Sequence, residues 1–137
     1  MASRHAKIWK ALKDHLGAYP GLPATVVYGG QSFDDPDPTL PYMIVDDVRF
    51  DPSRAYWEGV EWHTGSLAVH CMIPLQWTDL QSAEFAGALC DYFAPDAVME
   101  YDGISVRVAK QPAVSGAGYR DGSHFRLPCL VYWEGWG

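Results

Sequence analysis

The amino-acid sequence predicts an α+β fold in which two helices pack on a mostly antiparallel β-sheet. Three features indicate this class: two segments with helical spacing of apolar residues, five strand-like runs, and their order, α-β-β-β-α-β-β. Consecutive strands with no helix between them favour antiparallel pairing, because short turns can join them. The 137 residues, 48% of them hydrophobic, suffice for a single domain over residues 1–137 with its own core.

The first helix is expected over residues 3–16. Ser3 can cap its first turn, and Gly17 suits the position just after its last turn. Residues four apart stack on one face of a helix, and three of them are apolar here: Ile8, Leu12 and Leu16. A single apolar stripe predicts that this helix lies against a sheet.

The second helix is expected to begin after Thr78 and to continue to about Phe93. Residues 78–81 (TDLQ) have the spacing of a capping box, and Pro95 prevents continuation. The predicted buried stripe of this helix consists of Leu80, Ala83, Ala86, Cys90 and Phe93.

The predicted strands are Thr25–Tyr28, Pro41–Val48, Trp62–Ile73, Ile104–Lys110 and His124–Trp133. Their apolar residues alternate with others, as expected for strands with one buried face. The clearest inward-facing set lies in the longest strand: Leu67, Val69, Cys71 and Ile73.

Irregular structure is expected between some of these strands. Residues 49–60 are predicted to be a connector, and residues 111–122 a flexible loop rich in glycine. Pro128 has no N–H to donate, so it predicts an edge position or a bulge within the last strand.

The charge balance argues against a protein that binds nucleic acid through its phosphates. The formal net charge is −7, and the ten basic residues are scattered. Their one short cluster lies along the first predicted helix and consists of Arg4, Lys7, Lys10 and Lys13. Its regular spacing indicates a solvated face, and an anion-binding or partner-docking face is the alternative.

The cysteines and the N-terminal sequence indicate folding in a reducing cytoplasm. Cys71, Cys90 and Cys129 are odd in number, far apart in the sequence and placed in apolar segments, so we expect buried free thiols and no disulfide framework. The first residues lack the apolar run of a signal peptide, and no stretch is long and apolar enough to span a membrane.

No residue pattern predicts catalysis or metal binding. His63 and His70 are an odd number of residues apart on one strand, so they should face opposite sides and cannot share a metal. No serine has a G-x-S-x-G context, and apolar surroundings raise the pKa of a thiol. The paired carboxylates show no convergence on a pocket: Asp34 with Asp35, Asp46 with Asp47, and Glu58 with Glu61. We therefore expect no enzyme, no metal and no cofactor.

Aromatic residues are more numerous in and beside the predicted loops than a solvated connector requires. Protein interfaces are enriched in Trp, Tyr and Arg, although each such residue could instead fold back onto the core. The candidates for a subunit or partner interface are Phe50, Arg54, Tyr56, Trp57, Trp62, Tyr119 and Arg120.

Three stretches resemble a known family. They are residues 40–45 (LPYMIV), the strand and capped helix over residues 65–93, and residues 121–132, in which an Asp-Gly turn precedes a strand containing R-x-P. The chain resembles, over nearly its whole length, the tail terminator (tail completion) proteins of bacteriophages with long non-contractile tails.

The resemblance implies a structural virion protein without cofactor or catalysis. It implies a homo-oligomeric ring, typically a hexamer, that caps the tail tube at the head-proximal end, ends tail polymerisation and docks the head-side connector. DNA would only pass through the lumen, and assembly would take place in the host cytoplasm. The net acidic charge of the subunit leads to the hypothesis that the lumen does not hold DNA phosphates. The connector over residues 49–61 and the loop over residues 111–123 are candidates to reach a neighbour or the tube.

Three other functions remain open from the sequence. Another phage neck or minor tail protein would share a small α+β fold and ring assembly. A small hydrolase would use an Asp or a Cys together with His70. A ligand-binding module would gather its aromatic residues around one cavity.

Overall fold

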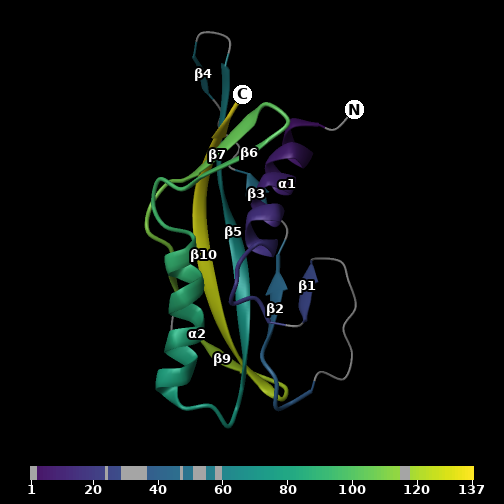
Figure 1. Cartoon of the computed structure of the whole chain (residues 1–137), viewed down its shortest axis with the longest axis vertical. Coiled ribbons are helices and arrows are strands. Elements are labelled where there is room, and N and C mark those ends of the chain that lie inside the picture. Colours follow the sequence, from purple (N-terminus) through teal and green to yellow (C-terminus); the bar gives the residue numbers. More distant parts are fainter. Residues whose placement is uncertain are drawn as a thin grey trace.

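The computed structural model describes residues 3–23, 25–28, 37–46, 48–50, 55–57, 60–114 and 118–137. Figure 1 shows the arrangement of two helices and one sheet. The elements are, in chain order, α1 (Arg4–Gly17), β1 (Val26–Tyr28), β2 (Tyr42–Val45), β3 (Arg49–Phe50), β4 (Ala55–Trp57), β5 (Val60–Pro74), α2 (Asp79–Tyr92), β6 (Val98–Tyr101), β7 (Ile104–Val108), β8 (Ala113–Val114), β9 (Tyr119–Asp121) and β10 (His124–Trp136). The predicted α+β class is confirmed, and its element order holds once the short strands are added.

The two long strands β5 and β10 form the centre of the sheet. They pair antiparallel along their full lengths, from His124 opposite Pro74 to Trp136 opposite Trp62. The sheet order is β1-β2-β5-β10-β7-β6, with β3 and β4 on β5 and with β8 and β9 on β10. All of these pairings are antiparallel except that of β1 with β2, which is parallel. A parallel pair needs about a dozen or more residues between its strands for the chain to return, and the segment between β1 and β2 is long enough.

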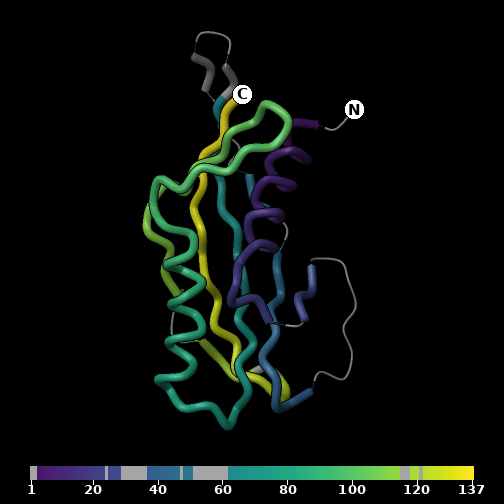
Figure 2. The backbone as a smooth tube through the Cα atoms, viewed as in Figure 1, coloured from purple at the N-terminus to yellow at the C-terminus, as the bar shows by residue number. Residues whose placement is uncertain are grey.

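Both helices cover the same face of the sheet. Inward-facing residues of β5, β7 and β10 form one buried cluster with residues of α1 and α2. In Figure 1 α1 lies beside the upper half of the sheet and α2 beside the lower half. Figure 2 shows that α1 begins and β10 ends at the same end of the molecule.

The first helix agrees closely with its prediction. Ser3 accepts a hydrogen bond from the N–H of Ala6 at 3.1 Å, and the predicted apolar stripe is buried together with Ala11. Gly17, however, is the last helical residue and not the one that follows the helix. The cap is Ala18, which keeps a right-handed conformation and therefore needs no glycine.

The second helix has the predicted capping box but a different buried stripe. The N–H of Thr78 donates to Gln81 Oε1 at 2.9 Å, and the N–H of Gln81 donates to Thr78 Oγ1 at 3.2 Å. Leu80 is 69% exposed. The later turns of α2 contact the sheet instead, so the predicted burial of Leu80 and Ala83 was wrong. The buried residues of this segment are Ala86, Leu89, Cys90 and Phe93.

The short strands account for most of the differences from the predicted elements. β3 and β4 lie within the expected connector, and β8 and β9 lie within the expected loop. Each is two or three residues long and owes its strand conformation to pairing with β5 or β10. β6 was also missed, although Asp102 (φ 47°) and Gly103 (φ 82°) form the two-residue turn that joins it to β7.

Pro128 lies on the central strand β10 without a bulge, but among the described residues its position is unpaired on one side, which agrees with the predicted edge position. It is opposite His70 of β5. On its other side β10 pairs with β9 at residues 124–126 and with β8 at residues 129–130. Pro128 falls between these two stretches, where among the described residues no ladder partner needs its missing N–H.

Gly65 permits a close approach of β3 and of the Trp133 ring to β5. It lies opposite Phe50 of β3 and opposite Trp133 of β10. A Cβ atom here would overlap the carbonyl oxygen of Arg49 and lie 2.6 Å from the Trp133 ring. Only glycine therefore allows the edge-to-face contact between the Phe50 and Trp133 rings, whose centroids are 5.0 Å apart.

Replacing Gly65 by alanine should lower the free energy of unfolding by about 3 kcal/mol, because backbone and a buried indole must both move. Gly87 of α2 is the matched control, since a Cβ there meets nothing within 4 Å. Gly87→Ala should raise the free energy of unfolding by about 0.5 kcal/mol. Urea unfolding followed by circular dichroism measures both, and equal effects at the two positions would contradict the packing described.

Candidate protein-binding surfaces

The face of the sheet opposite the helices carries apolar side chains that alternate with those of the core. The register places Ala68 opposite Leu130, and Ser66 opposite Tyr132. Ala68 and Leu130 are partly exposed, and Tyr132 is 39% exposed. We call this surface, centred on Ala68, Leu130 and Tyr132, the open face. The face is mixed, because Thr64, Ser66 and His70 lie on the same side of β5.

Two tryptophans extend the open face toward the end of β10. Trp62 and Trp136 are opposite each other in the register, and their rings stack with centroids 5.6 Å apart. The Arg107 guanidinium lies 5.9 Å from the Trp136 centroid and donates a hydrogen bond to Glu134. The predicted interface residue Trp62 therefore lies on this surface, where a stacked partner orients it.

A second uncovered apolar surface lies on the helix side of the sheet. It is a groove of about 490 Å³ between α2 and the β5 and β10 strands, and its lining includes Ile73, Trp77, Ala83, Val114, Phe125 and Leu127. Ala83, at the start of the second turn of α2, is exposed at this groove. We call this feature the α2 groove. It lies on the opposite side of the sheet from the open face.

The remaining predicted interface residues do not gather in one patch. Phe50 packs inward against His5, with ring centroids 4.3 Å apart, and is half-buried. Tyr119 is 54% exposed, and Arg120 next to it is exposed; both are on β9. In Figure 1 β9 and β4 lie at opposite ends of the sheet.

Part of the predicted interface cannot be placed. Arg54 lies outside the described residues. For Tyr56 and Trp57 the structure describes the backbone, which pairs with β5, but not the side chains.

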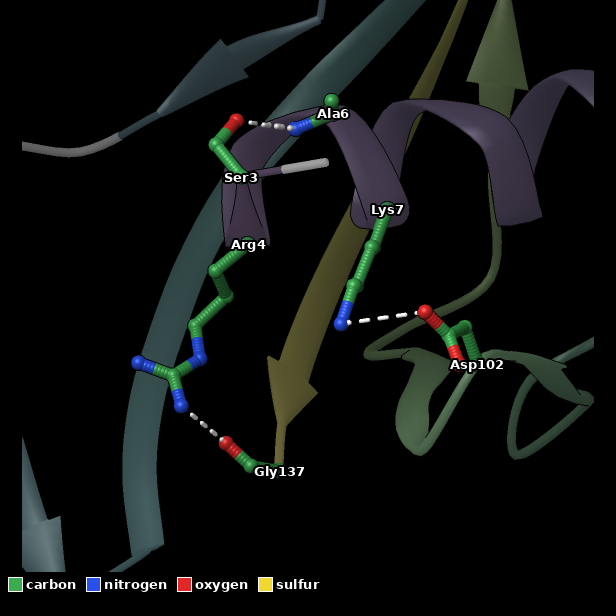
Figure 3. Close-up of polar contacts among 6 residues, drawn as sticks. All are labelled: Ser3, Arg4, Ala6, Lys7, Asp102 and Gly137. Atoms are coloured by element: carbon green, nitrogen blue, oxygen red, sulfur yellow. Dashed lines mark hydrogen bonds and ion pairs between the residues drawn. The ribbon is translucent and has the colours of Figure 1, made fainter. Parts of the chain in front are cut away.

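The basic side chains of α1 each have a partner within the chain. Lys7 Nζ is 3.1 Å from Asp102 Oδ2, and Arg4 donates to the carbonyl oxygen of Gly137 (Figure 3). Lys10 pairs with Asp14 at 2.8 Å. Lys13 Nζ lies 4.3 Å from the centroid of the Tyr28 ring. These contacts favour a structural role for this face over partner docking.

The histidines lie as strand alternation predicts. His63 is buried on the core side of β5, and His70 lies on the other side. His70 Nε2 is 2.8 Å from Asp46 Oδ2, a pairing that the sequence did not indicate. In the register His70 is flanked by Ile44 and Pro128. Cys71, the adjacent candidate nucleophile, faces the core, so His70 and Cys71 diverge as expected.

The other carboxylate pairs bring little to a site. Asp34, Asp35, Asp47 and Glu58 lie outside the described residues, as does the side chain of Glu61. Within the described part of the chain, no group of three or more His, Cys, Asp or Glu residues is placed to hold a metal ion.

The three cysteines are buried free thiols, as predicted. Burial raises the pKa of Cys71 to about 12. Cys90 and Cys129 were not expected to meet, yet their Sγ atoms are 2.9 Å apart. Both residues fall on predicted core-facing positions, so the sequence indicates that each is buried. It does not indicate which part of the helix packs on which part of the strand, and their contact could not be predicted.

A protein-family model described as "Phage tail terminator protein" matches residues 7–133. The chain belongs to the phage tail terminator family. The resemblance found in the sequence is thereby confirmed, and this terminator protein is a structural component of phage tails. One solved structure, 21% identical in sequence, shares its fold with a TM-score of 0.65, covering 94% of this chain and 90% of the other. The comparison with curated proteins gave no match. In the described residues of the terminator, neither helix has the length and apolar character needed to cross a membrane.

The two faces of the sheet should respond differently to loss of a tryptophan. Trp133 lies in the core and is 1% exposed, so Trp133→Ala should lower the free energy of unfolding by about 4 kcal/mol. Trp136→Ala on the open face should lower the free energy of unfolding by about 1 kcal/mol, mainly because the stacking of Trp136 on Trp62 is lost. Urea unfolding of the two variants measures this, and a larger cost at Trp136 would show that the open face is part of the core.

Proposed function

We propose that this chain forms a hexameric ring that caps the phage tail tube at its head-proximal end. The ring ends tube polymerisation and offers a docking surface to the head-side connector. Its partners are further copies of itself, the tail tube protein and a neck protein. It assembles in the host cytoplasm and requires no cofactor and no catalysis.

One observation carries the ring: two different uncovered apolar surfaces lie on opposite sides of the same sheet. A closed ring needs heterologous contacts, in which one surface of a subunit meets a different surface of its neighbour. The open face and the α2 groove supply such a pair. Surfaces of this kind are rarely left to water in a monomer.

The charge of the chain supports a passive role toward DNA. With a formal net charge of −7, a subunit does not hold phosphates by charge neutralisation. The basic residues of α1 are engaged within the chain, at Asp14, Tyr28, Asp102 and Gly137. DNA would then pass through the ring unread.

The open face is tested by Leu130→Asp. An exposed carboxylate does not disturb the core but must be desolvated at an apolar contact, so we expect at least a tenfold weaker association. Leu40→Asp is the matched control, since Leu40 is 55% exposed in the turn before β2 and belongs to neither surface. Native mass spectrometry should show rings for the control and smaller species for Leu130→Asp. Intact rings of Leu130→Asp would exclude the open face as a contact.

The pairing of the two surfaces is tested by mixing variants. Ala83→Arg places a long charged side chain in the α2 groove and should also prevent ring closure. Each variant retains the surface that the other has lost. An equimolar mixture of Ala83→Arg and Leu130→Asp should therefore form heterodimers that grow no further, and a mixture that stays monomeric would show that the two surfaces do not meet.

The capping activity is tested with polymerising tail tube protein, whose tube lengths are measured by electron microscopy. Added chain should stop growth and sit at one end of each tube. A chain that assembles into rings yet leaves growth unchanged would indicate a different neck or minor tail protein.

A further inference from the structure

Two cysteines that are far apart in the sequence meet between α2 and the centre of the sheet. Cys90 lies on the sheet-facing side of α2, and Cys129 lies in β10. Their Sγ atoms are 2.9 Å apart, and both remain thiols. A disulfide holds its sulfurs at about 2.05 Å, so bond formation requires an approach of less than about 1 Å.

The two residues differ in how firmly they are held. Cys129 is 0% exposed and is paired in the sheet with Val69 of β5 on one side and Val114 of β8 on the other. Cys90 is on a helix that borders the open α2 groove, and it retains 6% exposure. The helix is therefore the partner that can shift to close the gap.

We propose that Cys90 and Cys129 are a redox pair that stays reduced while the protein folds and assembles, and that becomes a disulfide when the particle meets a peroxide oxidant outside the host. The setting of this change, a virion released from the cell, rests on the proposed function. The sulfur contact itself does not.

The chemistry needs one two-electron oxidant, a peroxide. The Cys90 thiolate attacks one peroxide oxygen, forming a sulfenic acid as the O–O bond breaks and hydroxide leaves. The Cys129 sulfur then attacks the Cys90 sulfur, and the S–O bond breaks. Hydroxide leaves and, with the Cys129 proton, forms water. In total two thiols and one hydrogen peroxide give one disulfide and two waters.

The order of these steps follows from the environment of each thiol. A hydrogen bond from Cys129 lowers the pKa of Cys90, whereas that contact and burial raise the pKa of Cys129. Cys90 is thus the thiol that ionises first, and it is also the more accessible of the two. Because both are largely buried, the first step depends on local opening of α2 and should be slow.

The disulfide would staple α2 to β10. It would join residues 39 positions apart and thereby restrict the unfolded chain. For a chain of this size we expect the melting temperature to rise by about 10 °C. The last turn of α2 would then be held against β10.

The test uses the purified full chain, kept reduced and then treated with hydrogen peroxide. Mass spectrometry without reductant should show a loss of about 2 Da and a cross-linked peptide that joins Cys90 to Cys129. The melting temperature should rise and return to its starting value after dithiothreitol. The treatment is repeated at a urea concentration below the unfolding transition, where local opening gives peroxide more access to the buried thiols.

Cys71 supplies the matched control, since it is buried in the same core. Cys71→Ala should still form the cross-link and show the thermal shift, whereas Cys90→Ala and Cys129→Ala should show neither. A preferred cross-link through Cys71, sulfinic acids without a cross-link, or no reaction in either buffer would overturn the proposal. Ring formation is measured separately on the same samples, so a chain that fails to form rings would count against the proposed function only.

Discussion

The antiparallel pairing of β5 with β10 is the constraint on which the rest of the structure depends. It runs from Trp62 opposite Trp136 to Pro74 opposite His124. Every other strand except β1 and β6 pairs directly with one of these two; β1 pairs with β2, and β6 pairs with β7. Because side chains alternate along both strands, this one pairing also divides the molecule into a face that both helices bury and an open face.

The sequence predicted what depends on local pattern. The Ser3 cap, the Thr78 capping box and the core-facing alternation of β5 are all present. It could not predict what depends on partners. The strands β3, β4, β8 and β9 are too short to have a pattern of their own. Leu80 and Leu89 are nine residues apart, so they lie on opposite sides of α2, and the sheet covers the side that carries Leu89. Phe50 illustrates the same limit for the interface, since its inward position depends on the space that Gly65 leaves.

The same division of the sheet separates His70 from the three cysteines. His70 and Asp46 meet on the open face, while the cysteines face the core. Both sides of the sheet have uncovered apolar surface. It lies at Leu130 and Tyr132 on one side and in the α2 groove on the other. Membership of the phage tail terminator family is consistent with such surfaces being contacts. Cys90 lies one helical turn after Ala86, which lines the groove, so a change in its redox state would act close to one of the proposed contacts.

The central claim is that one subunit carries two different surfaces that close into a ring. Native mass spectrometry of the unmodified chain over a range of concentrations tests it most directly. A closed ring predicts one discrete assembly of six copies, whose mass stays constant as concentration rises. A strictly monomeric chain, or an open series of masses that lengthens with concentration, would contradict it.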